Sequence, residues 1–157
     1  MRRLARPSDI DQVFAIYAHP RVNPYLTHAV DNIAVFERIY DGLVASGLFV
    51  WEVDGRIAGM GRVIFHEGRA SHAALLSTIA VAPDLHGTGV AREMLEDTIA
   101  RLRSTGLVRL ELYVEADNPR GQAFYRKLGF EVEGVCRKGW RHADGSYVDD
   151  ILMAMLL

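Results

Sequence analysis

The spacing of apolar residues changes several times in the first part of the chain. Residues 10–17 and 32–46 carry apolar side chains every three or four positions, which predicts two amphipathic helices. Residues 48–53 and 56–66 are typical of strands, and the Asp54-Gly55 pair between them is a strong short signal for a β-hairpin. We therefore expect a short N-terminal strand, two helices and a hairpin here.

The later part of the chain predicts alternating strands and helices. A strand runs up to Pro83, a helix covers residues 89–104, and a further strand covers residues 107–114. This succession normally gives two parallel strands with a right-handed crossover. A short helix over residues 118–128 follows, then a strand over residues 130–135 and, after a loop, a terminal strand from Tyr147. The pattern predicts a single α/β (α+β) domain over residues 1–157, with a mixed sheet of about seven strands.

Composition and charge narrow the class of protein. Half of the 157 residues are hydrophobic and 24% are charged, which is ordinary for a globular protein. The net charge of −2 provides no basic surface for a nucleic acid. Cys136 is the only cysteine, which fits a reducing compartment. The basic N-terminus lacks the apolar run of a signal peptide, and residues 151–157 are too few to span a membrane. We expect a cytoplasmic protein without nucleic-acid or membrane partners.

A loop with two glycines separates the strand that ends at Pro83 from the helix over residues 89–104. The free N–H groups and the positive dipole end of a helix N-terminus suit a phosphate group. No Gly-Lys-Ser/Thr follows, and Arg92 occupies the position of the third glycine of the dinucleotide fingerprint. The loop therefore predicts a phosphate-bearing ligand other than ATP or NAD, while a tight structural turn is the alternative.

Two motifs in this region resemble those of the GCN5-related N-acetyltransferases, the GNAT family. The first resembles the family pattern Gln/Arg-x-x-Gly-x-Gly/Ala and reads His86-Gly87-Thr88-Gly89-Val90-Ala91. The second resembles the pattern Asn-x4-Ala-x-x-Tyr-x-x-x-Gly-Phe and reads Asn118-Pro119-Arg120-Gly121-Gln122-Ala123-Phe124-Tyr125-Arg126-Lys127-Leu128-Gly129-Phe130. Both motifs lie in the order that the family has.

The resemblance implies the GNAT fold, with about four helices and a mostly antiparallel sheet whose two central parallel strands splay apart. It implies acetyl-CoA as the acetyl donor and no metal. Main-chain N–H groups of residues 87–91 would bind the pyrophosphate, and backbone groups of Ile79 and Val81 would pair with the pantetheine amides. His86 is a departure, since the family has Gln or Arg there. The implied acetyl-CoA-binding residues are Ile79, Ala80, Val81, His86, Gly87, Thr88, Gly89, Val90, Ala91, Arg92 and Asn118.

The resemblance implies a general acid but leaves the general base open. Tyr125 matches the family tyrosine that lies near the CoA sulfur and acts as general acid, with an aromatic residue on the buried face of a short helix as the alternative. Asn118 is either a helix N-cap or a residue that positions CoA. The strand before the glycine loop has no carboxylate, so the candidate bases are His66, His72, Glu111, Glu115 and Asp149. No histidine pair has the spacing of a zinc site.

The function that the resemblance implies is acetyl-CoA-dependent N-acetylation of a small-molecule primary amine, such as an amino acid or a phosphinothricin-like compound. The alternatives are N-terminal acetylation of a ribosomal protein and a non-catalytic acyl-CoA sensor. Dimers are common in the family, so a homodimer is a further option. Five aromatic residues near the N-terminus are expected in the core or at the wall of the acceptor pocket: Phe14, Tyr17, Tyr25, Phe36 and Tyr40.

Overall fold

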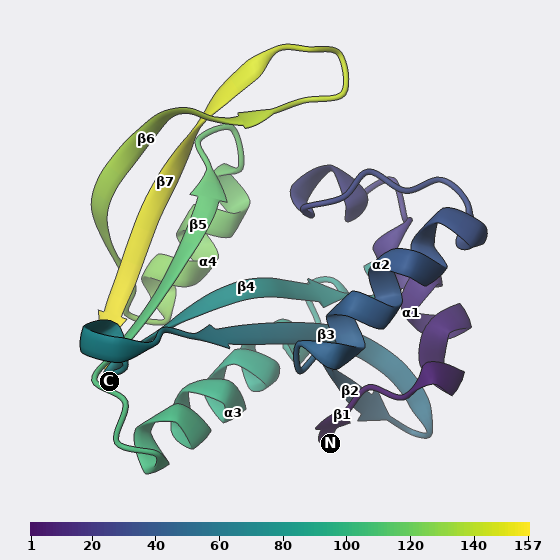
Figure 1. Cartoon of the computed structure of the whole chain (residues 1–157), viewed down its shortest axis with the longest axis horizontal. Helices are drawn as coiled ribbons and strands as arrows, with labels where there is room; N and C mark the ends of the chain where they lie inside the picture. Colours follow the sequence, from purple (N-terminus) through teal and green to yellow (C-terminus); the bar gives the residue numbers. More distant parts are fainter. The chain divides into compact units, whose positions relative to one another are not determined.

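The computed structural model describes residues 1–157 and divides them into two compact units. Unit 1 comprises Met1–Ile64 and Leu76–Ala100, and unit 2 comprises Phe65–Leu75 and Arg101–Leu157. The chain passes between the units within strands β3 and β4 and within helix α3, all of which Figure 1 labels. The units therefore share regular elements and are not joined by a linker.

Unit 1 contains strands and helices from the first two thirds of the chain. They are β1 (Arg2–Leu4), α1 (Ile10–Tyr17), α2 (Ile33–Ala45), β2 (Phe49–Val53), most of β3 (Arg56–Phe65), the later part of β4 (Ala73–Val81) and the start of α3 (Val90–Ser104). Strand β2 pairs antiparallel with β1 and with β3. Asp54 and Gly55 have φ angles of 50° and 74°, as a two-residue hairpin turn requires. The predicted hairpin is therefore confirmed.

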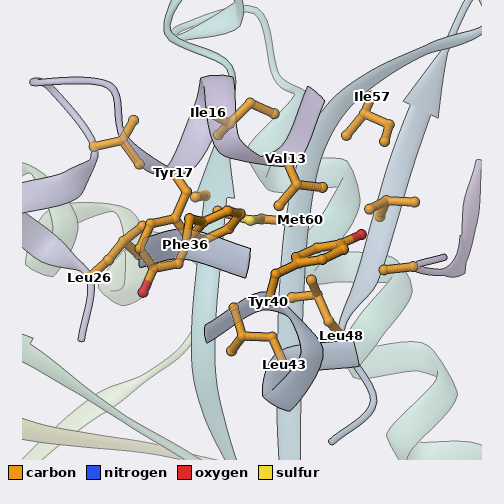
Figure 2. Close-up of a cluster of buried hydrophobic side chains, with 14 of the residues drawn as sticks. Val13, Ile16, Tyr17, Leu26, Phe36, Tyr40, Leu43, Leu48, Ile57 and Met60 are labelled. Atoms are coloured by element: carbon orange, nitrogen blue, oxygen red, sulfur yellow. The ribbon is translucent and has the colours of Figure 1, made fainter. Parts of the chain in front are cut away.

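Aromatic rings hold α1 and α2 together in the core of unit 1, as Figure 2 shows. The ring of Phe36 lies 4.9 Å from that of Tyr17, 5.6 Å from that of Tyr40 and 5.5 Å from that of Phe14, between centroids. Tilted rings at these separations stabilise a core beyond their buried area. Tyr25 differs, because it ends a 3-10 turn between the helices and is 47% exposed. Four of the five aromatic residues therefore belong to the core.

Unit 2 contains the start of β4, the end of α3 and four complete elements: β5 (Arg109–Glu115), α4 (Pro119–Lys127), β6 (Glu131–Arg141) and β7 (Tyr147–Leu156). Ala73–Leu75 of β4 pair in parallel with β5, and β7 pairs antiparallel with β5 and β6. Figure 1 shows β6 and β7 as a long hairpin. The sequence placed a strand only over residues 130–135. Strand β6 continues to Arg141 because a register shift after Cys136 restores its pairing with β7.

The two faces of the sheet in unit 2 carry different side chains. Strand alternation places one set of residues, all buried, on the first face: Leu110, Leu112, Val114, Met153 and Met155. A Cβ added to Gly129, which follows α4, would lie 3.1 Å from Cε of Met155, so α4 ends against this face. The opposite face carries the alternate residues, among them Glu111, Tyr113, Glu115 and Asp150.

The hydrogen-bonded strand order is β1-β2-β3-β4-β5-β7-β6. The sheet is mixed, because β4 and β5 are parallel whereas the β1–β2, β2–β3, β5–β7 and β6–β7 pairs are antiparallel. Seven strands and four α-helices confirm the predicted fold class. None of the helices combines the length and the apolar character that crossing a bilayer would need.

Candidate functional site

The glycine loop of unit 1 exposes main-chain donors at the start of α3. The N–H groups of Gly87, Gly89, Val90 and Ala91 donate to no acceptor of the protein. The N–H of Thr88 donates to the carbonyl of Leu85 over 3.3 Å, so this one predicted donor is already engaged. Free N–H groups at a helix N-terminus form an anion-binding site. The loop therefore has the free donors that the predicted phosphate site requires.

Both glycines of the loop have backbone conformations that other residues rarely adopt. The φ angles are 85° at Gly87 and 99° at Gly89, in the left-handed region. A Cβ at either position would meet no protein atom within 4 Å. The glycines are thus not required by packing within the protein. Their positive φ angles turn the main chain outward, and the space that a Cβ would fill is open to a ligand.

The edge of β4 before the loop has main-chain groups that do not pair with β3. The N–H of Ala82 donates to the carbonyl of Ala58 in β3 over 2.8 Å. Since successive residues of a strand point their N–H and C=O groups to opposite edges, Ala80 faces β3, while Ile79 and Val81 face the other edge. The parallel pairing with β5 covers only Ala73–Leu75. The predicted contacts of Ile79 and Val81 with pantetheine require this free edge of β4.

His86 links the glycine loop to that edge. Its Nε2 lies 3.0 Å from the carbonyl oxygen of Val81, so Nε2 carries the hydrogen and donates it. Its Nδ1 is buried and has no hydrogen-bond partner. The carbonyl of Val81 is thus occupied by the residue that departs from the family pattern. Arg92, also a predicted ligand, instead directs its guanidinium to Glu96 over 2.8 Å.

Replacing His86 should test whether this link shapes the loop. We expect His86→Ala to weaken acetyl-CoA binding about fivefold, because about 1 kcal/mol of hydrogen-bond energy is lost. His86→Gln should stay within about twofold of wild type, because its amide can donate to the same carbonyl. Calorimetric titration with acetyl-CoA measures both variants. An unchanged affinity of His86→Ala would show that the side chain does not hold the loop.

Unit 2 contains Asn118 and Tyr125, the other two predicted site residues. Oδ1 of Asn118 accepts a hydrogen bond from the N–H of Gly121 over 2.9 Å, so Asn118 is the N-cap of α4. The ring of Tyr125 packs edge-on against Phe130, with 5.8 Å between centroids. Burial, and secondly the charge of Glu115, raise the pKa of the Tyr125 hydroxyl. The phenol therefore keeps its proton at neutral pH, as a general acid must.

The structure gives the five candidate bases different surroundings. Nε2 of His66 lies 2.9 Å from Oε1 of Glu111, and Oε2 of Glu111 pairs with Arg109. His66 and Glu111 therefore belong to one surface network. Asp149 accepts the N–H of Lys138 over 2.8 Å, and His72 is exposed. Glu115 alone is buried, at 8% exposure. No side chain donates a hydrogen bond to its carboxylate.

Burial gives the Glu115 carboxyl an unusual protonation equilibrium. Its pKa is raised to about 7, chiefly because burial disfavours the charged form and secondly because Asp150 and Asp117 lie close to it. A carboxyl group that titrates near neutral pH is suited to acid–base work. Asp150 was not a candidate from sequence, because only the strand register shows that Asp150, and not Asp149, stands opposite Glu115. No group of three or more His, Cys, Asp or Glu side chains could hold a metal ion.

A comparison with known proteins identifies the family of a chain with this glycine loop after a sheet strand. The model of the Acetyltransferase (GNAT) family matches residues 10–130. The chain belongs to this family. The GNAT match covers the glycine loop, Glu115, Asn118 and Tyr125, and it confirms the resemblance that the two sequence motifs carried.

Individual GNAT relatives differ in their named substrates. The chain is 33% identical over 143 residues to a mycothiol acetyltransferase of Saccharomonospora viridis, with 84% of this chain and 45% of the relative covered. It is 39% identical over 82 residues to the ribosomal protein bS18 alanine N-acetyltransferase of Salmonella typhimurium, with 52% and 55% covered. The chain spans about half the length of the curated relatives that it matches.

A solved structure shows the same fold over the whole chain. The crystal structure of a ribosomal-protein-alanine N-acetyltransferase from Brucella melitensis has a TM-score of 0.81 with this chain at 21% sequence identity. The comparison covers 100% of this chain and 99% of that one. The likeness shows a GNAT fold.

Proposed function

We propose that this GNAT chain transfers the acetyl group of acetyl-CoA to the primary amine of a small molecule. The observation that carries the proposal is the loop at the start of α3, where the N–H groups of Gly87, Gly89, Val90 and Ala91 are free and both glycines border open space. These donors would hold the pyrophosphate of CoA, and the free edge of β4 at Ile79 would pair with pantetheine. Acetyl-CoA supplies the acetyl thioester, and no metal takes part.

The share of the chain that one relative matches favours a small-molecule acceptor. The mycothiol acetyltransferase matches 84% of the chain, whereas the bS18 alanine N-acetyltransferase matches 52%. The longer match includes more of the chain outside the acetyl-CoA motifs, where a GNAT enzyme recognises its acceptor. Acetylation of a protein N-terminus is the second candidate, and the bS18 relative supports it with the higher identity.

The experiment that tests the function measures the release of CoA thiol from acetyl-CoA across a panel of acceptors. The panel holds amino acids, amino-acid amides, aminoglycosides, polyamines and a short peptide with an N-terminal alanine. We expect thiol release with at least one small amine and little with the peptide. Turnover with the peptide alone would favour N-terminal acetylation. Tight acetyl-CoA binding without amine-dependent release would identify a sensor and overturn the proposal.

A further inference from the structure

Arg62 of strand β3 is a partly buried arginine without a carboxylate partner. Its guanidinium donates only to neutral hydroxyl groups, from Nη1 to Oγ of Ser46 over 2.9 Å and from Nη2 to Oγ of Ser77 over 2.7 Å. The protein therefore does not neutralise the charge of Arg62. The other partly buried arginines all form ion pairs: Arg2 with Asp97, Arg3 with Asp9 and Glu52, and Arg109 with Glu111 and Glu133.

The hydrogen-bonding capacity of Arg62 is also incompletely used. Its Nε is buried and has no hydrogen-bond partner. Each terminal nitrogen carries two hydrogens, so one on Nη1 and one on Nη2 remain after the bonds to the two serines. A buried N–H without an acceptor costs free energy, and such a group in a native protein needs an explanation. The fold thus supplies Arg62 with neither a negative charge nor enough acceptors.

Three hydroxyl groups lie close to Arg62, and one of them has a free hydrogen. The hydroxyl of Ser46 donates to the carbonyl of Gly42 over 2.7 Å and is thus engaged with the end of α2. Burial raises the pKa of the Tyr17 hydroxyl, and the charge of Arg62 only partly opposes this rise, so Tyr17 brings no negative charge. The hydroxyl of Ser77 accepts from Arg62 but donates to no acceptor of the protein. Arg62 and Ser77 therefore present unused donors from the neighbouring strands β3 and β4.

The position of Ser77 along β4 relates these donors to the glycine loop. Strand β4 ends at Val81, just before the loop, and Ile79 precedes Val81 by two residues. Ser77 precedes Ile79 by two more residues, which in a strand is about 7 Å further from the loop. In the proposed function, CoA extends from the loop to Ile79, so its acetyl end points towards Ser77 and Arg62. The loop, Ile79, Ser77 and Arg62 all belong to unit 1.

We propose that Arg62 and Ser77 bind a carboxylate group of the acceptor, so that the enzyme selects amino acids among primary amines. The proposal rests on the proposed function and deepens it, because it names the acceptor class and the residues that recognise it. A carboxylate supplies the missing negative charge and two oxygens that accept from several donors at once. The planar donors of an arginine match these two oxygens. A polyamine brings further positive charge and would be repelled.

The first test compares the best amino acid of the panel with its own amide as acceptor. Both compounds present the same amine, but only the acid brings a carboxylate. In wild type, kcat/KM should be at least about tenfold higher for the acid, and Arg62→Gln should lower this acid-to-amide ratio at least about tenfold. Arg56→Gln is the matched control, since Arg56 begins the same strand but already pairs with Asp84. It should keep the ratio of wild type.

Two further measurements do not depend on turnover. They use protein saturated with free CoA, which carries no acetyl group to transfer. Calorimetric titration should show that wild type binds the acid at least about tenfold more tightly than the amide. Ser77→Ala keeps the charge of Arg62 and loses one neutral donor, so it should bind the acid about fivefold more weakly than wild type. Saturating acid should raise the Tm of wild type, and it should raise the Tm of Arg62→Gln by less.

The outcomes distinguish this proposal from the proposed function. If wild type acetylates acid and amide equally well, or if Arg62→Gln keeps the acid-to-amide ratio, the proposal is wrong while the function stands. An unchanged ratio together with an acetyl-CoA affinity that falls about tenfold in Arg62→Gln would assign the charge of Arg62 to a phosphate of CoA and would also overturn the proposal. If no amine of the panel releases thiol, the proposed function fails, and equal calorimetric affinities of acid and amide would then remove the carboxylate site as well.

Discussion

Gly89→Val should abolish acetyl-CoA binding, with an increase in the dissociation constant of more than about 100-fold. Gly89 has a φ of 99°, which a β-branched residue adopts only with strain. The valine side chain would also enter the open space above the loop, where no protein atom lies within 4 Å. It would therefore meet the ligand and not the protein. Calorimetric titration with acetyl-CoA measures the loss.

A second glycine separates the effect of strain from the effect on the ligand. Gly106 has a φ of 80°, and a Cβ there also meets no atom within 4 Å. Gly106→Val should lower the Tm through backbone strain of about 1–3 kcal/mol but keep acetyl-CoA affinity near that of wild type. If Gly89→Val binds acetyl-CoA as tightly as Gly106→Val, the loop does not hold the pyrophosphate.

Tyr125→Phe should lower kcat by about 100-fold and leave the acetyl-CoA dissociation constant nearly unchanged. The substitution removes only the hydroxyl, so the ring keeps its edge-on contact with Phe130, 5.8 Å away between centroids. Because burial raises the pKa of Tyr125, the hydroxyl stays protonated at neutral pH and can donate to the thiolate. Steady-state kinetics with saturating amine, together with acetyl-CoA titration, separates turnover from binding.

The control for the loss of a tyrosine hydroxyl is Tyr40→Phe. Tyr40 lies in the core of unit 1, and its hydroxyl donates to the carbonyl of Arg6 over 2.7 Å. Its replacement should cost about 1 kcal/mol of stability and leave kcat unchanged. Equal kcat values for Tyr125→Phe and Tyr40→Phe would reduce Tyr125 to a packing residue of α4, which was the alternative from sequence.

The predictions from sequence differ in how well they match the structure, and the reason is the range of the interactions involved. The Asp54-Gly55 hairpin and the N-cap role of Asn118 depend on residues close in sequence, and the structure shows both. The end of β6 was wrong in the sequence prediction, since Trp140 and Arg141 are strand residues only because β7 pairs with them. The engaged N–H of Thr88 likewise depends on the path of the loop.

The sequence by itself determined the fold class, the glycine loop before α3 and the family, because glycine positions, helix starts and strand alternation are local properties of the chain. The tertiary structure alone decided which candidate base is buried and has no side-chain partner. Glu111 and Glu115 lie on the same strand face and are indistinguishable by spacing, but only Glu111 meets His66 and Arg109. Glu115 stands opposite Asp150 at 8% exposure. Burial and charge pairing depend on distant strands, and these set the pKa of a carboxyl group.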